Sequence, residues 1–221
     1  RHGDVFLGGG VRAGRSHGDG RGEALTPAAP DPSVMLVRQA PTAWSGRRYC
    51  GRSDPPLSAA GRALADAVAA DLAPGLPDAV HLITSPRRRA LATATAIVAA
   101  LGPRWTGTLE IDDRWAEADM GLADGRTFDE LVSLAPELAA RLAAGPTSID
   151  WPRGETGIVF TARVEAAWRS LVEAPDRSVV VISHGGPIRL AIALATGVRP
   201  DAIAVPAPGA AVRIEVPVGA A

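Results

Sequence analysis

The sequence predicts an α/β fold with a mostly parallel sheet, and two observations support this. Short apolar runs typical of buried strands recur along the chain. Longer stretches with apolar residues at helical spacing lie between these runs. This alternation is the order expected of parallel strands joined by crossover helices.

Five apolar runs are predicted to form the strands. The first ends in Arg38, and the fourth is followed directly by His184. Both runs are apolar along their length, which is typical of strands that are covered on both faces. The predicted strands are Val34–Arg38, Val80–Thr84, Thr108–Ile111, Val179–Ser183 and Ala211–Val216.

Four helices are predicted between and after these strands. Ser58 is a suitable N-cap for the first, and Pro86 suits the opening of the second. Residues 112–154 contain no strong strand, so we expect a loop with short helices over one end of the sheet. The predicted helices are Ser58–Leu72, Pro86–Leu101, Glu155–Glu173 and Gly186–Thr196.

Residues 33–221 are predicted to form one domain. The chain of 221 residues is 47% hydrophobic, which is enough to bury a sizeable core. Residues 1–32 are rich in Gly, Arg, Asp and Pro, so we expect a flexible N-terminal tail. The His-Gly-Asp stretches at His2 and His17 follow no apolar strand, and no chemistry is assigned to them.

Composition narrows the class of partner. The formal net charge is -1 and no long basic run occurs, which argues against nucleic acid or an anionic membrane and favours a small molecule. The single cysteine, Cys50, rules out an intramolecular disulfide and a cysteine-based zinc site. It also fits a reducing compartment, and with no apolar run of about 18 residues we expect a cytoplasmic protein. All 23 basic residues are arginine, which excludes Schiff-base and P-loop lysine chemistry.

Polar residues follow three of the predicted strands, at the edge where open α/β sheets bind ligands. Arg38 and Gln39 follow the first strand, residues 87–89 follow the second, and His184 follows the fourth. Arginines, a histidine and the helix N-terminus at residues 185–186 suit a dianion such as phosphate. The alternative is that the arginines are solvated and His184 only caps a helix.

Five segments resemble the histidine phosphatase superfamily, the group that includes phosphoglycerate mutases and α-ribazole phosphatase. They stand in the family's order over nearly all of Val34 to Val216. The segments are LVRQAPTAW with RRYCGRSDPPLSAAG, SPRRRALATA, RWAEADMG, GET and SHGG. The resemblance implies a three-layer α/β/α sandwich of the phosphoglycerate mutase type, with a small phosphorylated metabolite as partner. It implies no metal or other cofactor and leaves a homodimer open, and RYCGRSDPPLS leans toward the α-ribazole phosphatase-like branch.

The resemblance also implies roles for individual residues. Arg38, Arg89 and His184 match the positions that grip the phosphoryl group. Arg89 is chosen because it directly precedes Ala90 in the R-A-x-x-T-A pattern. Arg87 and Arg88 are then expected to be surface charges.

Glu117 matches the general acid that protonates the leaving alcohol. Its alternative is a solvated loop carboxylate. Arg48 and Arg52 lie in the loop that usually shapes the substrate side, and the sequence does not choose between them.

Gln39 departs from the family pattern, which has the nucleophilic histidine at this position. An amide nitrogen shares its lone pair with the carbonyl, so it donates hydrogen bonds but does not attack phosphorus. We therefore expect a phosphomonoester hydrolase that acts on a small organic phosphate. Because Gln39 cannot form the phosphohistidine intermediate, we expect this chain to be inactive or strongly impaired.

Three other functions stay open on the sequence alone. The chain could be a non-catalytic phospholigand-binding or regulatory pseudoenzyme on the same fold. Glu117 and His184 could also run acid/base chemistry on a phosphorylated ligand without a covalent intermediate. Mutase activity is less expected, because residues 112–154 show no extra cluster of basic residues for a second phosphate.

Overall fold

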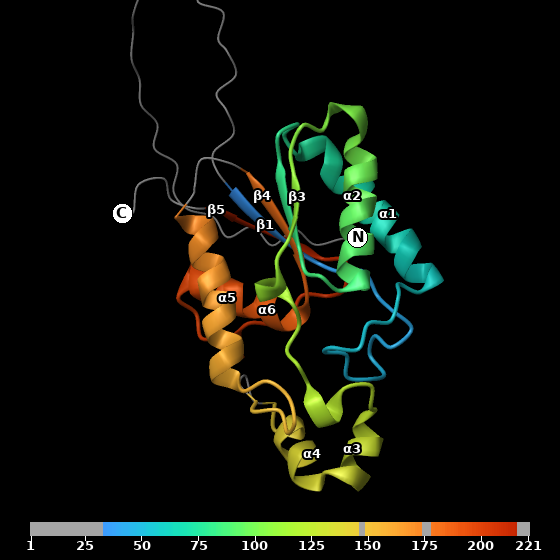
Figure 1. Ribbon diagram of the computed structural model, residues 1–221, viewed down its shortest axis with the longest axis vertical. Coiled ribbons are helices and arrows are strands. Elements are labelled where there is room, and N and C mark those ends of the chain that lie inside the picture. Colours follow the sequence, from blue (N-terminus) through green and yellow to red (C-terminus); the bar gives the residue numbers. More distant parts are fainter. Residues whose placement is uncertain (1–32, 146–148, 174–177, 216–221) are drawn as a thin grey trace, which may run out of the picture. The chain divides into compact units, whose positions relative to one another are not determined.

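A five-stranded sheet forms the centre of the fold. The computed structural model describes residues 33–145, 149–173 and 178–215. The strand order is β3-β2-β4-β1-β5; the first four strands are parallel and β5 is antiparallel to β1 (Figure 1). The strands are β1 (Ser33–Arg38), β2 (His81–Thr84), β3 (Leu109–Ile111), β4 (Val179–Ser183) and β5 (Ala211–Glu215). The predicted mostly parallel sheet is confirmed, with strand bounds that differ from the predicted ones by at most one residue.

Four long helices connect and follow the strands: α1 (Ala59–Leu72), α2 (Arg88–Leu101), α5 (Gly157–Val172) and α6 (Gly185–Thr196). The predicted N-cap of α1 is confirmed, because Ser58 Oγ accepts a hydrogen bond from Gly61 N at 2.9 Å. The predicted start of α2 at Pro86 is wrong by two residues. Arg87 has extended backbone angles and is the N-cap, and its N–H donates to Ser85 Oγ at 3.3 Å instead of entering the helix.

The helices lie in two layers, one on each face of the sheet. Met35 and Val37 of β1 pack in a core with α1 and α2, whereas Val34 and Leu36 pack in a second core with α5 and α6. Val179 to Ile182 of β4 alternate in the same way. Successive strand side chains point to opposite faces, so an apolar run supplies both cores at once. The three-layer α/β/α arrangement is therefore confirmed.

Residues 112–154, called the insertion below, carry short helices and a small core of their own. The helices are α3 (Phe128–Leu134) and α4 (Pro136–Ala143), which lie together away from the sheet in Figure 1. Thr127 and Glu130 form a capping box at the start of α3. The small core contains Ala123, Leu131, Leu138 and Ala139. The predicted loop with short helices is confirmed for the part that the structure describes.

The predicted flexible tail, residues 1–32, lies outside the described residues, and the domain boundary at residue 33 stays a prediction. Within the residues that are described, no helix is long and apolar enough to cross a membrane.

Candidate active site

The carboxyl ends of three neighbouring parallel strands meet at one edge of the sheet. Gln39 N donates to Ser183 O at 2.9 Å, which ties the exit of β1 to that of β4. Ser85 N donates to Ile182 O at 3.0 Å, which ties the exit of β2 to the other side of β4. Gln39 and His184 therefore follow adjacent strands, as the strand-end argument predicted, and Ser85 follows the strand on the other side of β4.

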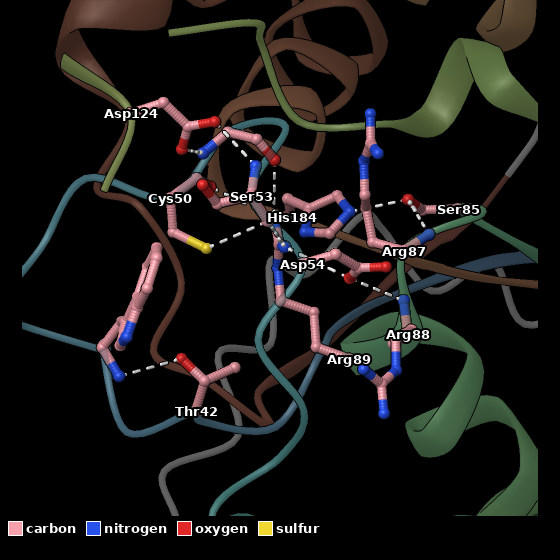
Figure 2. A network of polar contacts seen from close by, with 12 residues as sticks. Thr42, Cys50, Ser53, Asp54, Ser85, Arg87, Arg88, Arg89, Asp124 and His184 are labelled. Carbon is pink, nitrogen blue, oxygen red and sulfur yellow. Dashed lines mark hydrogen bonds and ion pairs between the residues drawn. The ribbon is translucent and has the colours of Figure 1, made fainter.

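His184 is buried at the centre of this edge, with only 1% of its surface exposed. Its Nε2 lies 2.7 Å from Ser85 Oγ (Figure 2). Ser85 Oγ accepts from Arg87 N and can donate its own hydrogen to Nε2; in that arrangement the imidazole hydrogen is on Nδ1. His184 Nδ1 is buried and has no hydrogen-bond partner among the described residues.

The surroundings of His184 are strongly positive. Burial lowers its pKa well below the ordinary histidine value, and Arg89, Arg87, Arg38 and Arg163 lower it further. The imidazole is therefore neutral at pH 7, and the field of four guanidinium groups favours an anion at this point.

Arg38 packs against the start of α6. It donates to Pro206 O at 2.6 Å, while its Nε is buried without a partner among the described residues. A methyl group on Gly185 would come 3.4 Å from Arg38 Cζ and 2.7 Å from a methyl group of Val205, so a glycine is needed for this close approach. Burial lowers the pKa of Arg38; Glu117 opposes that effect and Arg89 adds to it.

Gln39 is 7% exposed, and its Oε1 is buried without a partner in the described part of the chain. A half-turn of the amide would bring its NH2 to the same point. The side chain therefore offers one unused hydrogen-bonding group beside Arg38 and His184.

Arg89 is held by a loop that follows β1. It is 2% exposed and donates to Ser53 O at 2.9 Å, Cys50 O at 3.1 Å and Gly51 O at 3.2 Å (Figure 2). Asp54 lies 3.8 Å from the same guanidinium group. A guanidinium has five N–H donors, so these three bonds orient Arg89 and leave others for a ligand.

Asp124 of the insertion holds that loop, a role that the sequence reasoning missed. Its Oδ1 accepts from Gly51 N at 2.9 Å and its Oδ2 from Ser53 N at 2.6 Å (Figure 2). Asp124 therefore acts on Arg89 through the loop between them. No local pattern in the sequence links three residues so far apart.

Glu117 lies at the N-terminus of α6, where the predicted acid is brought beside the predicted phosphate grip. Its Oε2 accepts from Gly186 N at 3.3 Å and its Oε1 from Ala118 N at 3.0 Å. A methyl group on Gly186 would come 2.5 Å from Oε1, so a larger residue here would displace the Glu117 carboxylate from this position.

Arg163 of α5 holds the backbone around Glu117, and sequence reasoning missed it too. Its guanidinium makes two bonds to the Glu155 carboxylate, at 2.7 and 2.8 Å. It also donates to Arg114 O at 2.8 Å, Ala116 O at 2.7 Å and Glu117 O at 3.3 Å. The glutamate of the GET segment thus helps to orient the arginine that fixes the acid-bearing loop.

The two other arginines of the second strand-end segment differ from each other. Arg88 is exposed, as predicted. Arg87 is half-buried, and its Nε is buried without a partner among the described residues. The prediction that Arg87 is a surface charge is therefore wrong, because the extended N-cap conformation turns it toward the strand ends, where it lowers the pKa of His184.

Arg48 and Arg52 both bind the insertion. Arg48 donates to Gly125 O at 2.7 Å and pairs with Glu130 at 3.1 Å. The Arg52 side chain is 70% exposed and pairs with Asp119 at 3.3 Å. Neither lines the cleft of about 690 Å³ that contains Arg38 and Glu117. Their expected substrate-side role stays a prediction.

A second, polar cavity of about 400 Å³ gathers arginines that the sequence did not predict to cluster. Arg126 and Arg153 of the insertion line it together with Arg52, alongside Asp119 and Asp124. Across the described residues, no group of three or more His, Cys, Asp or Glu side chains is placed to hold a metal ion.

Comparison with known proteins gives the family. Residues 34–215 match the family model of the histidine phosphatase superfamily (branch 1). The chain belongs to this superfamily. The match spans all five segments that carry the resemblance in the sequence.

The similar proteins include a probable mutase and a phosphatase. The probable phosphoglycerate mutase GpmB of Salmonella paratyphi C is 35% identical over 154 residues, 69% of each chain. The mycobacterial glucosyl-3-phosphoglycerate phosphatase in complex with VO3 is 27% identical, with a TM-score of 0.70 over 82% of this chain and 90% of that one. An Escherichia coli K-12 protein provisionally assigned as an alpha-ribazole-5′-P phosphatase shares the fold, with a TM-score of 0.68 over 78% and 83% of the two chains at 24% identity.

Proposed function

We propose that this chain binds a phosphomonoester of a small organic molecule in a histidine phosphatase site that lacks its nucleophile. One observation carries the proposal: Arg38 Nε, Gln39 Oε1 and His184 Nδ1 are all buried without partners among the described residues. Buried polar groups are normally paired, and each unpaired one costs about 1–3 kcal/mol. The three residues lie at the ends of neighbouring strands in a positive field. A phosphate there would accept hydrogen bonds from Arg38 Nε and from His184 Nδ1.

Each side chain has a distinct role in this proposal. Arg38, Arg89 and His184 Nδ1–H donate to the phosphate oxygens and stabilise the charge of the transition state. Glu117, at the N-terminus of α6, delivers a proton to the oxygen of the departing alcohol. The complete reaction also needs a ring nitrogen at position 39, which takes the phosphoryl group and passes it to water.

Gln39 removes only this last element. Its amide donates a hydrogen bond to phosphate, but the delocalised lone pair does not form the N–P bond. We therefore infer that the chain binds phosphomonoesters and turns them over very slowly or not at all. A non-catalytic phospholigand-binding protein is the second candidate, favoured by the burial of Gln39 where the attacking atom is needed.

The proposal is tested by restoring the nucleophile. Gln39→His should release inorganic phosphate from an aryl phosphate, whereas the matched Gln39→Ala should not. Loss of a nucleophile costs roughly 10⁴–10⁶ in turnover in enzymes whose residues act as a unit, so a partial recovery would be measurable. If the Gln39→His protein binds phosphate but hydrolyses no phosphomonoester in a broad panel, the proposal of a phosphatase site is wrong. The phospholigand-binding function then replaces it.

A further inference from the structure

The site opens into a cleft that is much larger than a phosphate group requires. The cleft has a volume of about 690 Å³ and is lined by Arg38, Glu117, Gly185 and Gly186 among others. Clefts of this size hold drug-sized ligands. Because Glu117 is the proposed proton donor to the leaving oxygen, the alcohol part of the substrate has to occupy this space.

Apolar side chains from two parts of the molecule form most of the cleft lining. One group belongs to the small core of the insertion and the loop packed on it, so its positions are set by packing. The rings of Tyr49 and Trp151 in this group lie edge to face at 6.2 Å. The first group is Tyr49, Met120, Leu142, Ile149 and Trp151, and the second, from α5, α6 and the segment after α6, includes Phe160, Leu190, Leu194, Val198 and Val205.

The charged side chains of the cleft do not add up to a second anion site. Apart from Arg38 and Glu117, the charged lining residues are Glu165, Arg189 and Arg199. Arg199 is paired with Asp201 at 3.4 Å, and Glu165 and Arg189 carry opposite charges. An alcohol with its own carboxylate or phosphate would lose water here without gaining an uncompensated cation, which is unfavourable.

We propose that the ligand of this chain is a phosphate monoester of a bulky, largely apolar alcohol, whose apolar part fills the cleft between α6 and the insertion. The proposal rests on the proposed function, because the cleft receives the alcohol only if the phosphate lies at the strand ends. It separates this chain from the mycobacterial relative, which is named for a phosphoglycerate ester.

A series of primary alkyl phosphates tests the proposal with leaving groups of nearly equal basicity. The probes are ethyl, butyl, hexyl and 3-phenylpropyl phosphate, with glycerol 3-phosphate and 3-phosphoglycerate as polar counterparts. In the Gln39→His protein, kcat/KM should rise about fourfold for each methylene that enters the cleft, the equivalent of about 0.8 kcal/mol. The unmodified chain should show the same trend in affinity by calorimetry, because Gln39 leaves the ester intact.

Two pairs of variants locate the effect. Trp151→Ala should lower kcat/KM for 3-phenylpropyl phosphate at least about tenfold more than kcat/KM for ethyl phosphate; Trp44→Ala, also half-buried but outside the cleft lining, should not change the ratio of the two values. Leu194→Asn is a milder change at a position that is 37% exposed, so folding should tolerate it. Its matched control is Ile158→Asn, at an 82% exposed position outside the cleft lining.

The outcomes separate the two proposals. Hydrolysis that favours glycerol 3-phosphate or 3-phosphoglycerate over the long alkyl esters overturns the proposal of an apolar ligand and supports the proposal of a phosphatase. The arginines of the second cavity then become the candidate binding groups for the polar alcohol. If no ester is hydrolysed but affinity still rises along the alkyl series, the proposal of a phosphatase is overturned and the proposal of an apolar ligand is supported. An absence of both turnover and chain-length dependence overturns both.

Discussion

The proposed phosphate end of the site and its proposed alcohol end, which is the cleft beside it, are built in opposite ways. The phosphate end is charged and largely buried, and its groups come from strand exits and the first turn of α2: the half-buried Arg38 and the buried Gln39, Arg89 and His184. The alcohol end is apolar and partly open, and its side chains come from the insertion, α5, α6 and the segment that follows. The phosphate end is therefore set by the sheet, whereas the alcohol end is set by how peripheral elements pack.

This difference suggests how such a fold changes its ligand. Parallel strands in register place Arg38, Gln39 and His184 at one edge of the sheet, whereas Arg89 also needs the loop that Asp124 holds. The alcohol end depends on short helices with their own small core, which can vary without disturbing the sheet. We expect substitutions at the first end to change rate for every substrate, and those at the second to change the preference among substrates.

The largest effect expected from a substitution at the phosphate end, once the nucleophile is restored, is that of the acid. Adding Glu117→Gln to the Gln39→His protein should lower kcat on an alkyl phosphate by roughly 10²–10⁴ and affect a nitrophenyl phosphate little. Only the poor leaving group needs a proton in the transition state. The exposed Glu137→Gln is the matched control, and equal losses on both substrates would remove Glu117 from the role of acid.

The second effect is that of Arg163, which acts on the acid through the backbone. Arg163→Met leaves the Glu155 carboxylate without its ion-pair partner and removes the bonds to the carbonyls near Glu117. The two side chains are 20% and 11% exposed, so the loss should cost at most the about 3–5 kcal/mol of a fully buried ion pair, measured by urea unfolding. In the Gln39→His protein that remains folded, kcat on alkyl phosphates should fall more than KM changes. The control Arg169→Met, at an exposed position on the same helix, should change neither stability nor kcat. A loss of stability with an unchanged kcat in Arg163→Met would mean that Arg163 has only a structural role.

The same comparison explains what was predictable from the sequence. The place of Arg38 and His184 at strand ends was predictable because a buried run followed at once by a polar residue is a local pattern. Glu117 and Arg89 were found through the resemblance. The start of α2 was predicted wrongly at Pro86, because Arg87 takes extended backbone angles as the N-cap, with its N–H donated to Ser85 Oγ.

Asp124, Arg163 and the cleft were not found, for a different reason. Asp124 acts on residues 71 and 73 positions away, and Arg163 on residues up to 49 positions away. The cleft is lined by residues from Arg38 to Val205 that share no spacing. Such roles arise only when distant segments pack together, so the spacing of residues in the sequence does not predict them.

A smaller effect is expected where the two ends join, at Asp124. Asp124→Ala removes both acceptors that hold the loop carrying the carbonyl partners of Arg89. The affinity for inorganic phosphate should fall about tenfold, the equivalent of about 1.4 kcal/mol, near the value of one hydrogen bond to a charged group. Calorimetry measures this, with the exposed Asp129→Ala as control. An unchanged affinity would mean that Arg89 needs no support from the insertion.

The smallest effect is the pH dependence that His184 gives to stability. Burial and the surrounding arginines lower its pKa in the folded chain, whereas the unfolded chain titrates near 6.5. Below that pH the histidine is protonated in the unfolded state but not in the folded state. The free energy of unfolding therefore falls as the pH drops, by at most about 1.4 kcal/mol per pH unit. The fall should begin near pH 6.5 and be shallower in His184→Gln, as measured by urea unfolding between pH 7.5 and 5.5. Bound phosphate should reduce the fall, because a dianion beside the imidazole favours its protonated form. Identical pH slopes for the two proteins would mean that His184 is not held neutral in the folded chain.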